Sequence, residues 1–527
     1  MAAARLSHLR KSISAQAASL SGARSWLDAR HMPDWLPVLL GLSFGIGAAL
    51  LIVNGLWIAL VPLAALVPAT ILFLRYPFVA VILWILVFPY FVITPNDAFR
   101  IMYWLLHRLM IPAALVVVVF GDWFGLREHK PVRFGRAELC MLIFLLLALV
   151  NITVLTPRPT QFMIRFYDRL FVPFCMYWLV RLIGPTGRDL KRLGWAGLIT
   201  LVVQVIIGLL GWFAPQMLPE HWLNRLGERT VGTFGNPAVY TSTLIFLGLI
   251  FLQYGMQSYS RGLRALSLGV LGLAYLGTFF SFSRGSWLGA ALVWLGLFFV
   301  YSSAIRRWSA GVLACGLLLA FTTFAQELQW ASTRLEDQDT AQGRVLGAAT
   351  AFNMIENRPW LGWGFDSYDL YDEEFKTRVG DFAVREHQTS HNTYLLFIAE
   401  MGVISLLFYL LPALWWLLLT RKVWRRLPDS GMLSWQLVAM LWLLLLDHFT
   451  VSNFMDMIQS NLFGTTIWWL ALGLIASVVS ANLESGRIEA PQWTYQPPQL
   501  PAPRGAGLGW ITQSERGIQR IADRKAR

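Results

Sequence analysis

The sequence predicts an all-α fold, a polytopic transmembrane helix bundle of 12–14 spans with one long helical external loop. Three observations support this prediction. First, 56% of the 527 residues are hydrophobic and 14% are charged, whereas a soluble globular chain carries about 25% charged residues. Second, the apolar residues form continuous blocks of about 20, the length at which a helix crosses the hydrocarbon core, whereas strands of a membrane barrel alternate in polarity. Third, lysine and arginine gather in alternate connections between the blocks.

The N-terminal segment, residues 1–34, is polar and basic and does not have the form of a signal peptide, so we expect it in the cytoplasm. Transmembrane helices 1–11 are expected within residues 35–324. Their ranges are 35–53, 57–74, 78–93, 101–120, 139–155, 166–183, 193–213, 238–254, 265–280, 287–301 and 310–324. Only a short break at Asn54 separates the first two ranges, and a tight hairpin fits so short a connection.

A large periplasmic loop is expected at residues 325–391, where twelve Asp and Glu stand against six Lys and Arg. Apolar residues recur at helical spacing over 343–356, which predicts a helix that ends before Pro359. Transmembrane helices 12–14 are expected within residues 392–480, at 393–419, 434–451 and 463–480. The tail, residues 481–527, is rich in proline and basic residues and is expected in the cytoplasm.

The basic residues set the predicted orientation. With the N-terminus in the cytoplasm, the cytoplasmic connections hold 29 of the 43 lysines and arginines, and the external connections hold 12. This bias accounts for most of the net charge of +13, so no nucleic-acid partner is expected. The three cysteines lie inside apolar blocks without metal-ligand spacing, and we expect them to be packing residues.

Four polar clusters carry residues that suit chemistry, and the predicted topology places all of them on the external side. They are 228–237, 281–286, Arg344 with the turn 359–364, and 387–394 leading to Gly402. The guanidinium groups of Arg229, Arg284 and Arg344 suit phosphate oxygens and keep their charge at any relevant pH. Because they come from separate segments, they can converge on one anion. His391 lies at the outer end of a span, where an imidazole can accept a proton near neutrality.

Simpler interpretations stay open for these residues. An arginine beside the membrane commonly anchors lipid headgroups, and a histidine at the end of a span is commonly interfacial; His387 keeps that interpretation. Gly362 and Gly364 fit a turn, and Trp363 fits an interfacial anchor. Arg284 stands apart, because serine and glycine flank it in a tight turn between two spans.

In their order, spacing and side of the membrane, these clusters resemble the O-antigen ligase and polymerase family of bacterial membrane glycosyltransferases. The residues that carry the resemblance are Arg229 to Asn236, Ser283-Arg284-Gly285, Arg344, Pro359 to Gly364, and His391-Asn392 with Gly402. The resemblance runs from about Arg229 to Leu410. Ligases of the family often continue their glycine motif as Gly-x-x-Gly, whereas Ser405 occupies the last position here. This departure leaves ligase and polymerase both open.

The resemblance implies a metal-independent, inverting transferase of the bacterial inner membrane, with a periplasmic site and an undecaprenyl-diphosphate-linked glycan as donor. His391 would deprotonate or orient the acceptor hydroxyl, while Arg229 and Arg284 hold the diphosphate. The resemblance gives as substrate-binding residues Arg344, Asn392, Ser283, Asn236 and Tyr394. It implies no cofactor and no metal. The expected partners are the lipid-linked glycan, the lipid bilayer, and a flippase and chain-length regulator of the same pathway.

The acceptor would decide the reaction. A second lipid-linked glycan gives a polymerase of O-antigen or exopolysaccharide repeat units, which we place first. Lipid A-core gives a ligase, and a protein serine gives a protein O-oligosaccharyltransferase. A polysaccharide or lipid transporter is the alternative from another class. It predicts a central, two-sided cavity, whereas an enzyme predicts a one-sided external pocket.

Overall fold

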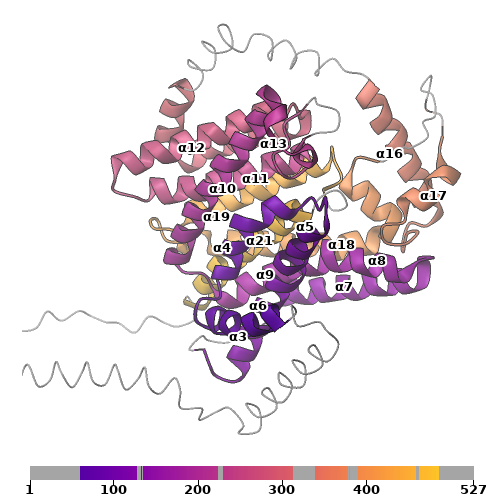
Figure 1. Ribbon diagram of the computed structural model, residues 1–527, viewed down its shortest axis with the longest axis horizontal. Helices are drawn as coiled ribbons and strands as arrows, with labels where there is room; N and C mark the ends of the chain where they lie inside the picture. The colour runs from indigo at the N-terminus through magenta and orange to yellow at the C-terminus, as the bar shows by residue number, and fades with distance from the viewer. Residues whose placement is uncertain are drawn as a thin grey trace, which may run out of the picture. The chain divides into compact units, whose positions relative to one another are not determined.

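The computed structural model describes residues 60–127, 132, 134–223, 229–311, 339–377, 379, 390–457 and 462–485, and helices make up its regular elements over these residues (Figure 1). The N-terminal half holds α3 Leu60–Arg75, α4 Val79–Val87, α5 Asp97–Tyr103, α6 Met110–Trp123, α7 Arg136–Leu155, α8 Pro159–Phe166, α9 Val172–Ile183, α10 Gly187–Phe213 and α11 Pro237–Met256. The C-terminal half holds α12 Arg261–Phe280, α13 Arg284–Val300, α16 Asp339–Asn357, α17 Tyr368–Phe375, α18 Thr393–Val423, α19 Trp435–Ser452 and α21 Leu462–Ser485.

Two short π-helical segments interrupt the N-terminal helices. η3, Trp104–Leu109, joins α5 to α6, and η4, Tyr167–Phe171, joins α8 to α9. The chain divides into two units, Met1–Asn482 and Leu483–Arg527, and everything below concerns the first. The predicted segment 1–34, the span 35–53, nearly all of 310–324, His387 and the tail beyond Ser485 lie outside the described residues.

Over their described residues, the other predicted spans are occupied by helix, which confirms the all-α membrane bundle. Within the described residues, eight helices are long and apolar enough to cross a membrane, and one bent pair brings the number to nine. The pair lies in the predicted ranges 57–74 and 78–93. Its two helices, Pro68–Arg75 and Val79–Phe91, are bent by 113° relative to each other. This is the geometry of a broken span or a re-entrant segment.

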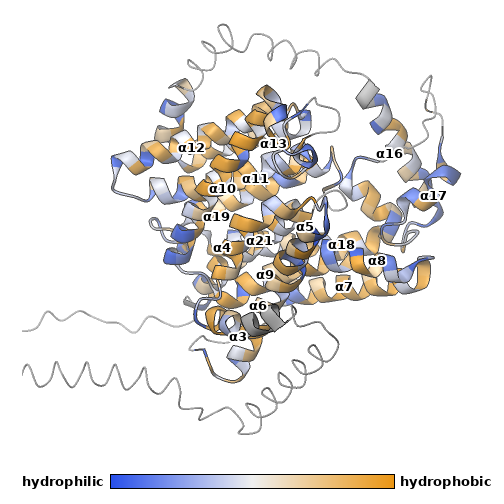
Figure 2. Cartoon of the chain, viewed as in Figure 1, coloured by the Kyte–Doolittle hydropathy of each residue, from blue (hydrophilic) through white to orange (hydrophobic). Residues whose placement is uncertain are grey.

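Figure 2 shows hydrophobic residues along the bundle helices and hydrophilic residues on α17.

Two helices, α11 and α21, lie inside the bundle. In their most apolar stretches 89% and 94% of the residues are buried, against 28% for the helix Asp97–Trp123. A helix that is apolar all round must find neighbours on every side, and α11 packs against α10, α12 and α19. By contrast, α7 exposes an apolar stripe suited to lipid, formed by Leu139, Leu142, Leu146 and Val150.

Ala238 near the start of α11 and Tyr254 near its end line different cavities, so these cavities lie at opposite ends of this helix. At one end, residues of 186–191, 254–259 and 431–432 line a common cavity, which we call the Lys191 cavity. The predicted topology places all three segments in the cytoplasm. The starts of α11, α13 and α18 lie at the other end, where the candidate site is found.

The loop that the sequence predicts to be external contains the helix expected at 343–356. The helix α16 begins earlier, at Asp339, and ends at Asn357, as the Asn-Arg-Pro sequence indicates. A second helix, α17, follows in the same loop and was not expected. Met354 of α16 and Tyr368 of α17 share a buried cluster with Leu396 of α18, which fixes this part of the loop to the bundle.

Candidate active site

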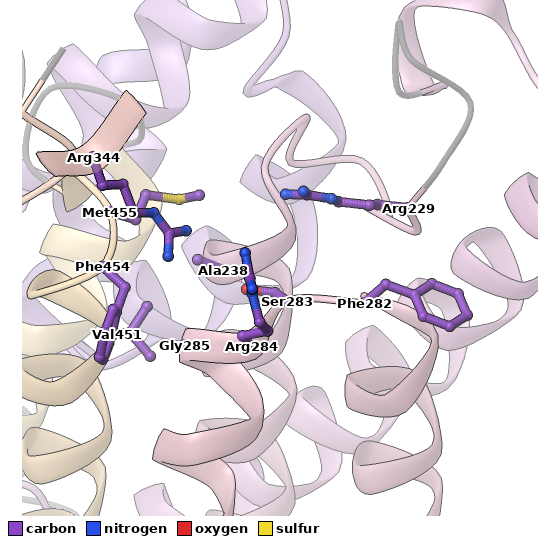
Figure 3. Close-up of a pocket in the computed structure, with 10 residues that line it drawn as sticks. All are labelled: Arg229, Ala238, Phe282, Ser283, Arg284, Gly285, Arg344, Val451, Phe454 and Met455. Carbon is purple, nitrogen blue, oxygen red and sulfur yellow. The ribbon is translucent and has the colours of Figure 1, made fainter. Parts of the chain in front are cut away.

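Two adjoining cavities bring the predicted site residues together. The Arg229 cavity is lined by Arg229, Arg284 and Arg344, and Figure 3 shows their guanidinium groups pointing toward one another. The His391 cavity has a volume of about 520 Å³ and is lined by His391 together with Arg284 and Arg344. Phe454 also lines both. Since the two cavities share these walls, we treat them as one site.

Arg229 begins a loop that is anchored to the bundle by a buried amide. Gln204 of α10 donates from Nε2 to the Thr233 hydroxyl at 2.8 Å, and its Oε1 accepts the Thr233 backbone N–H at 3.0 Å. Gly232 is left-handed, with φ of +54°, and a Cβ there would stand 2.5 Å from the Gln204 Oε1. The loop ends at Asn236, whose Oδ1 accepts the N–H of Ala238 at 2.9 Å and caps α11.

Arg284 is the first residue of α13, and a strained turn places it there. Phe282 has a left-handed φ of 47°, a conformation that non-glycine residues rarely adopt. Its buried ring packs among aromatic neighbours, which hold the turn in place: Trp212, Phe279, Phe280 and Trp287. Ser286 donates to the Ser283 hydroxyl at 2.9 Å. A Cβ at Gly285 would stand 2.9 Å from the Phe454 Cβ, so the small residue lets α13 approach this side chain.

His391 directly precedes Asn392, the residue that caps α18. Its φ is 46°, the second non-glycine left-handed residue of the site. The next residue, Asn392, caps α18 by accepting the N–H groups of Tyr394 and Leu395 at 2.9 and 3.0 Å. The Asn392 amide also donates to the Asn453 carbonyl at 3.3 Å. The start of α18 is thereby tied to the segment that follows α19.

The electrostatics suit an anion and a neutral base. Three arginines line the two cavities, and no carboxylate does so within the described part of the chain. The pKa of His391 is lowered from 6.5, chiefly by its partial burial and secondly by the positive charge of Arg344. Lowering the pKa keeps this imidazole neutral at pH 7, so that it can accept a proton.

The turn 359–364 docks onto a break in α18. Gly402 interrupts the helix with φ of 78° and ψ of 168°, and the turn supplies hydrogen bonds at the break. The Gly364 N–H donates to the Glu400 carbonyl at 2.8 Å, and the Val403 N–H donates to the Pro359 carbonyl at 2.9 Å. The glycines of this motif therefore allow two backbones to meet, which joins the loop that carries Arg344 to the helix that begins beside His391.

The predicted residues do not all take part in the same way. Ser283 lines the Arg229 cavity and Asn392 lines the His391 cavity. Asn236 and Tyr394 line neither cavity. Asn236 is a helix cap, and the Tyr394 ring packs on Phe449 with centroids 5.0 Å apart. Their proposed role in substrate binding therefore lacks a contact with either cavity.

Sequence reasoning missed two contributors. The end of α19 supplies Val451 to the Arg229 cavity, and the segment after it supplies Phe454 and Met455, although the sequence marked this stretch only as the end of a span. Glu400 lies buried in α18 and accepts the backbone N–H groups of Asp366 and Tyr368 at 2.9 and 3.1 Å. An acidic residue in an apolar block is a usable signal, because such a charge needs partners.

Comparison with protein families agrees with this geometry. The model described as O-antigen ligase matches residues 268–410, a range that contains Arg284, Arg344, His391 and Gly402. Arg229 precedes the matched range, and no curated protein matches the chain. Together with the polytopic helices, the match indicates a membrane glycosyltransferase-like function in O-antigen assembly. Residues 268–410 therefore match the O-antigen ligase family, and they lie within a multi-pass membrane helix bundle.

Proposed function

We propose that this chain transfers a glycan from an undecaprenyl-diphosphate-linked donor to an acceptor hydroxyl on the periplasmic face of the inner membrane. One observation carries the proposal. Arg229, Arg284, Arg344 and His391 come from four separate segments and line two cavities that share walls. Such a meeting of cations and a neutral imidazole suits a diphosphate leaving group and a hydroxyl nucleophile.

Each residue type has a distinct part in the proposed step. The acceptor oxygen attacks the anomeric carbon as its proton passes to His391, and the bond from that carbon to the diphosphate oxygen breaks. In-line attack inverts the anomeric configuration. Arg229, Arg284 and Arg344 hold the diphosphate and neutralise the charge that grows on it as it leaves. Because the guanidinium groups supply this positive charge, the proposal needs no metal ion.

Polymerisation of lipid-linked repeat units is our first proposal for the acceptor. Ligation to lipid A-core is the second, and the description of the matching family as O-antigen ligase favours it. Deletion of the gene, followed by gel analysis of surface glycans, separates the two. Loss of long chains with single repeats still attached to lipid A-core indicates polymerisation. Loss of all attached glycan indicates ligation.

The arrangement of the cavities favours an enzyme over a transporter. Arg229, Arg284, Arg344 and His391 meet at one end of the helices, while the Lys191 cavity at the other end has a separate set of lining residues. The direct test is the purified protein in vesicles with a lipid-linked glycan on one side. Formation of a new glycosidic product supports the proposal. Movement of unaltered lipid-linked glycan between leaflets, with no product, overturns it.

A further inference from the structure

A third cavity at the active-site end is lined by arginines that the proposed mechanism does not use. Its volume is about 430 Å³, and we call it the Arg169 cavity. Its basic lining residues are Arg100, Arg108, Arg165 and Arg169. They come from the helices α5 to η3 and α8 to η4, far in sequence from the residues of the active site.

Both helices form π-helical turns at this cavity. Arg108 lies in η3 and Arg169 in η4, and the Tyr167 hydroxyl of η4 donates to the Arg108 carbonyl at 2.7 Å. A π turn contains an extra residue, so it changes the direction in which the following side chains point. Such turns are rare and occur frequently at functional sites. Two of them, in contact at one cavity, are difficult to explain by packing alone.

The charges in this cavity leave a positive excess. Arg108 is neutralised by Asp168, to which it donates from Nε and Nη2 at 2.6 and 2.5 Å. Arg165 and Arg169 share a single buried carboxylate, Asp366, to which Arg169 donates at 2.5 Å. Arg169 makes no other hydrogen bond that the structure records, although a guanidinium has five N–H donors.

The remaining arginine adds to this excess. Arg100 pairs with Asp97, but their side chains are 65% and 81% exposed, so the pair contributes little and can open readily. In the described residues the four arginines pair with three carboxylates, Asp97, Asp168 and Asp366, and Asp168 is the one acidic residue among those that line the cavity. An anionic ligand would restore the balance.

The surroundings of the cavity suit a ligand with a lipid tail. Trp104 lines the cavity and is 52% exposed, and the centroid of its ring lies 4.1 Å from the Arg108 guanidinium carbon. Ile101 and Leu105 beside it are 59% and 37% exposed, so an apolar surface adjoins the charged one. A lipid with its polar head in the cavity and its apolar chain along this surface would contact both the charged and the apolar surface.

The cavity is next to the active site. Phe234 lines it, whereas Arg229 of the same loop lines the active site. Asp366, the shared partner of Arg165 and Arg169, follows the turn 359–364 that docks on α18. The loop from Arg229 to Asn236 therefore lies between two sites for anions that open at the same end of the helices.

We infer that the Arg169 cavity binds the phosphate or diphosphate headgroup of the second substrate, the lipid-anchored acceptor. This inference rests on the proposed function, which places the donor diphosphate among Arg229, Arg284 and Arg344. The shared chemistry is a phosphorylated lipid headgroup. Its source is a polyprenyl diphosphate if the protein is a polymerase, and a diphosphorylated glucosamine lipid if it is a ligase.

The test counts bound headgroups on the full-length protein by native mass spectrometry in detergent. The probes are geranylgeranyl diphosphate and diphosphoryl lipid A. We expect the wild type to bind two headgroups, and Arg169→Gln and Arg284→Gln to bind one each. Arg169→Gln leaves Asp366 paired with Arg165, so the fold should survive. Arg165→Gln is the second variant. The Arg165 side chain is 40% exposed, so its replacement should disturb the fold little. Losing a charge-assisted contact should weaken binding about tenfold or more.

Lys191→Gln is the matched control, because it removes a cation from the cavity at the other end and should bind two headgroups. In Arg284→Gln the headgroup that remains identifies the acceptor: geranylgeranyl diphosphate supports a polymerase, and lipid A supports a ligase. If Arg165→Gln and Arg169→Gln both bind as the wild type does, the inference is overturned and the donor site stands. If Arg284→Gln alone binds as the wild type does, the donor site is wrong and the Arg169 cavity stands.

Discussion

Gly402 of α18 lies directly against the carbonyl oxygen of Trp360, and a Cβ atom at Gly402 would stand 2.0 Å from that oxygen. The reciprocal position is equally close, because a Cβ at Gly362 would stand 2.3 Å from the Glu400 carbonyl. Both glycines have positive φ, at 78° and 68°. The loop with Arg344 and the helix that begins beside His391 therefore depend on this contact for their relative position.

Replacing Gly402 by alanine should destabilise the protein and abolish transfer. The backbone conformation of Gly402 is essentially restricted to glycine and costs an L-residue about 1–3 kcal/mol, and the clash with Trp360 adds to that. The measurement is thermal unfolding in detergent, with transfer measured on the folded protein. Gly269→Ala is the control, because a Cβ there meets nothing within 4 Å. Equal melting temperatures for Gly402→Ala and the wild type would contradict the docked turn.

Replacing His391 by alanine should lower the transfer rate by roughly 100- to 10,000-fold, the usual contribution of a general base. Donor binding should persist, since the arginines that hold the diphosphate remain. Product formation and donor accumulation are measured in membranes with equal amounts of each variant. His387→Ala is the control and should retain most activity. An active His391→Ala beside an inactive His387→Ala would assign the base to the wrong histidine.

Replacing Arg284 by lysine should lower turnover roughly tenfold to a hundredfold, although the charge is kept. Lysine lacks the planar fork that grips two phosphate oxygens together. Arg284→Ala should lose donor binding as well, because the leaving anion then lacks its counter-charge. The assay is glycan transfer with a titrated donor. Arg306→Lys is the control, since Arg306 is exposed and lies away from both cavities. Wild-type kinetics for Arg284→Lys would remove the bidentate contact from the mechanism.

The pH dependence should follow the neutral form of His391. Its pKa is lowered from 6.5, so activity should hold as the pH falls to 6.5 and decline only below it, where the imidazole gains a proton. Removing the positive charge of Arg344 removes one of the two causes that lower the pKa of His391, so this pKa should rise. Arg344→Gln should therefore move the acid limb of kcat/KM to higher pH, in addition to reducing its height. An acid limb that stays in place would show that Arg344 does not act on the base.

The orientation of the bundle can be tested by cysteine labelling in a background without the three native cysteines. Asp369 is an exposed residue of α17, and a cysteine there should react with an impermeant reagent in intact spheroplasts. A cysteine at the exposed Lys191 should react only after the membrane is opened. The reverse pattern would place the candidate site in the cytoplasm.

Much of this fold was predictable because a bilayer imposes one strong rule on the sequence. Long apolar blocks without charge must be helices, so the ranges of α7, α10, α11, α18 and α21 follow almost directly from composition. The bend between α3 and α4 was not predictable, since their sequences are apolar on both sides of the break. The turn at Tyr76-Pro77 is short, and only tertiary packing decides its angle.

The charged residues of the site could be predicted from the sequence, whereas the apolar residues that line it could not. Arg229, Arg284, Arg344 and His391 stand out as polar groups beside apolar blocks. The part played by Phe454 comes from its approach to Gly285, a contact between distant segments that no local pattern records. The π turns of η3 and η4 were missed for a related reason, because their sequences do not differ from those of ordinary helix.

The loop from Arg229 to Asn236 has a kinetic consequence. Its two sides face two cavities, with Arg229 on one and Phe234 on the other. If both cavities bind as proposed, two lipid headgroups are held at once, each with its own chain in the bilayer. Transfer would proceed through a ternary complex, and no glycan would need to rest on the protein between donor and acceptor. Initial rates should fit intersecting lines when both substrates are varied, and a headgroup on one side of the loop should change the affinity on the other.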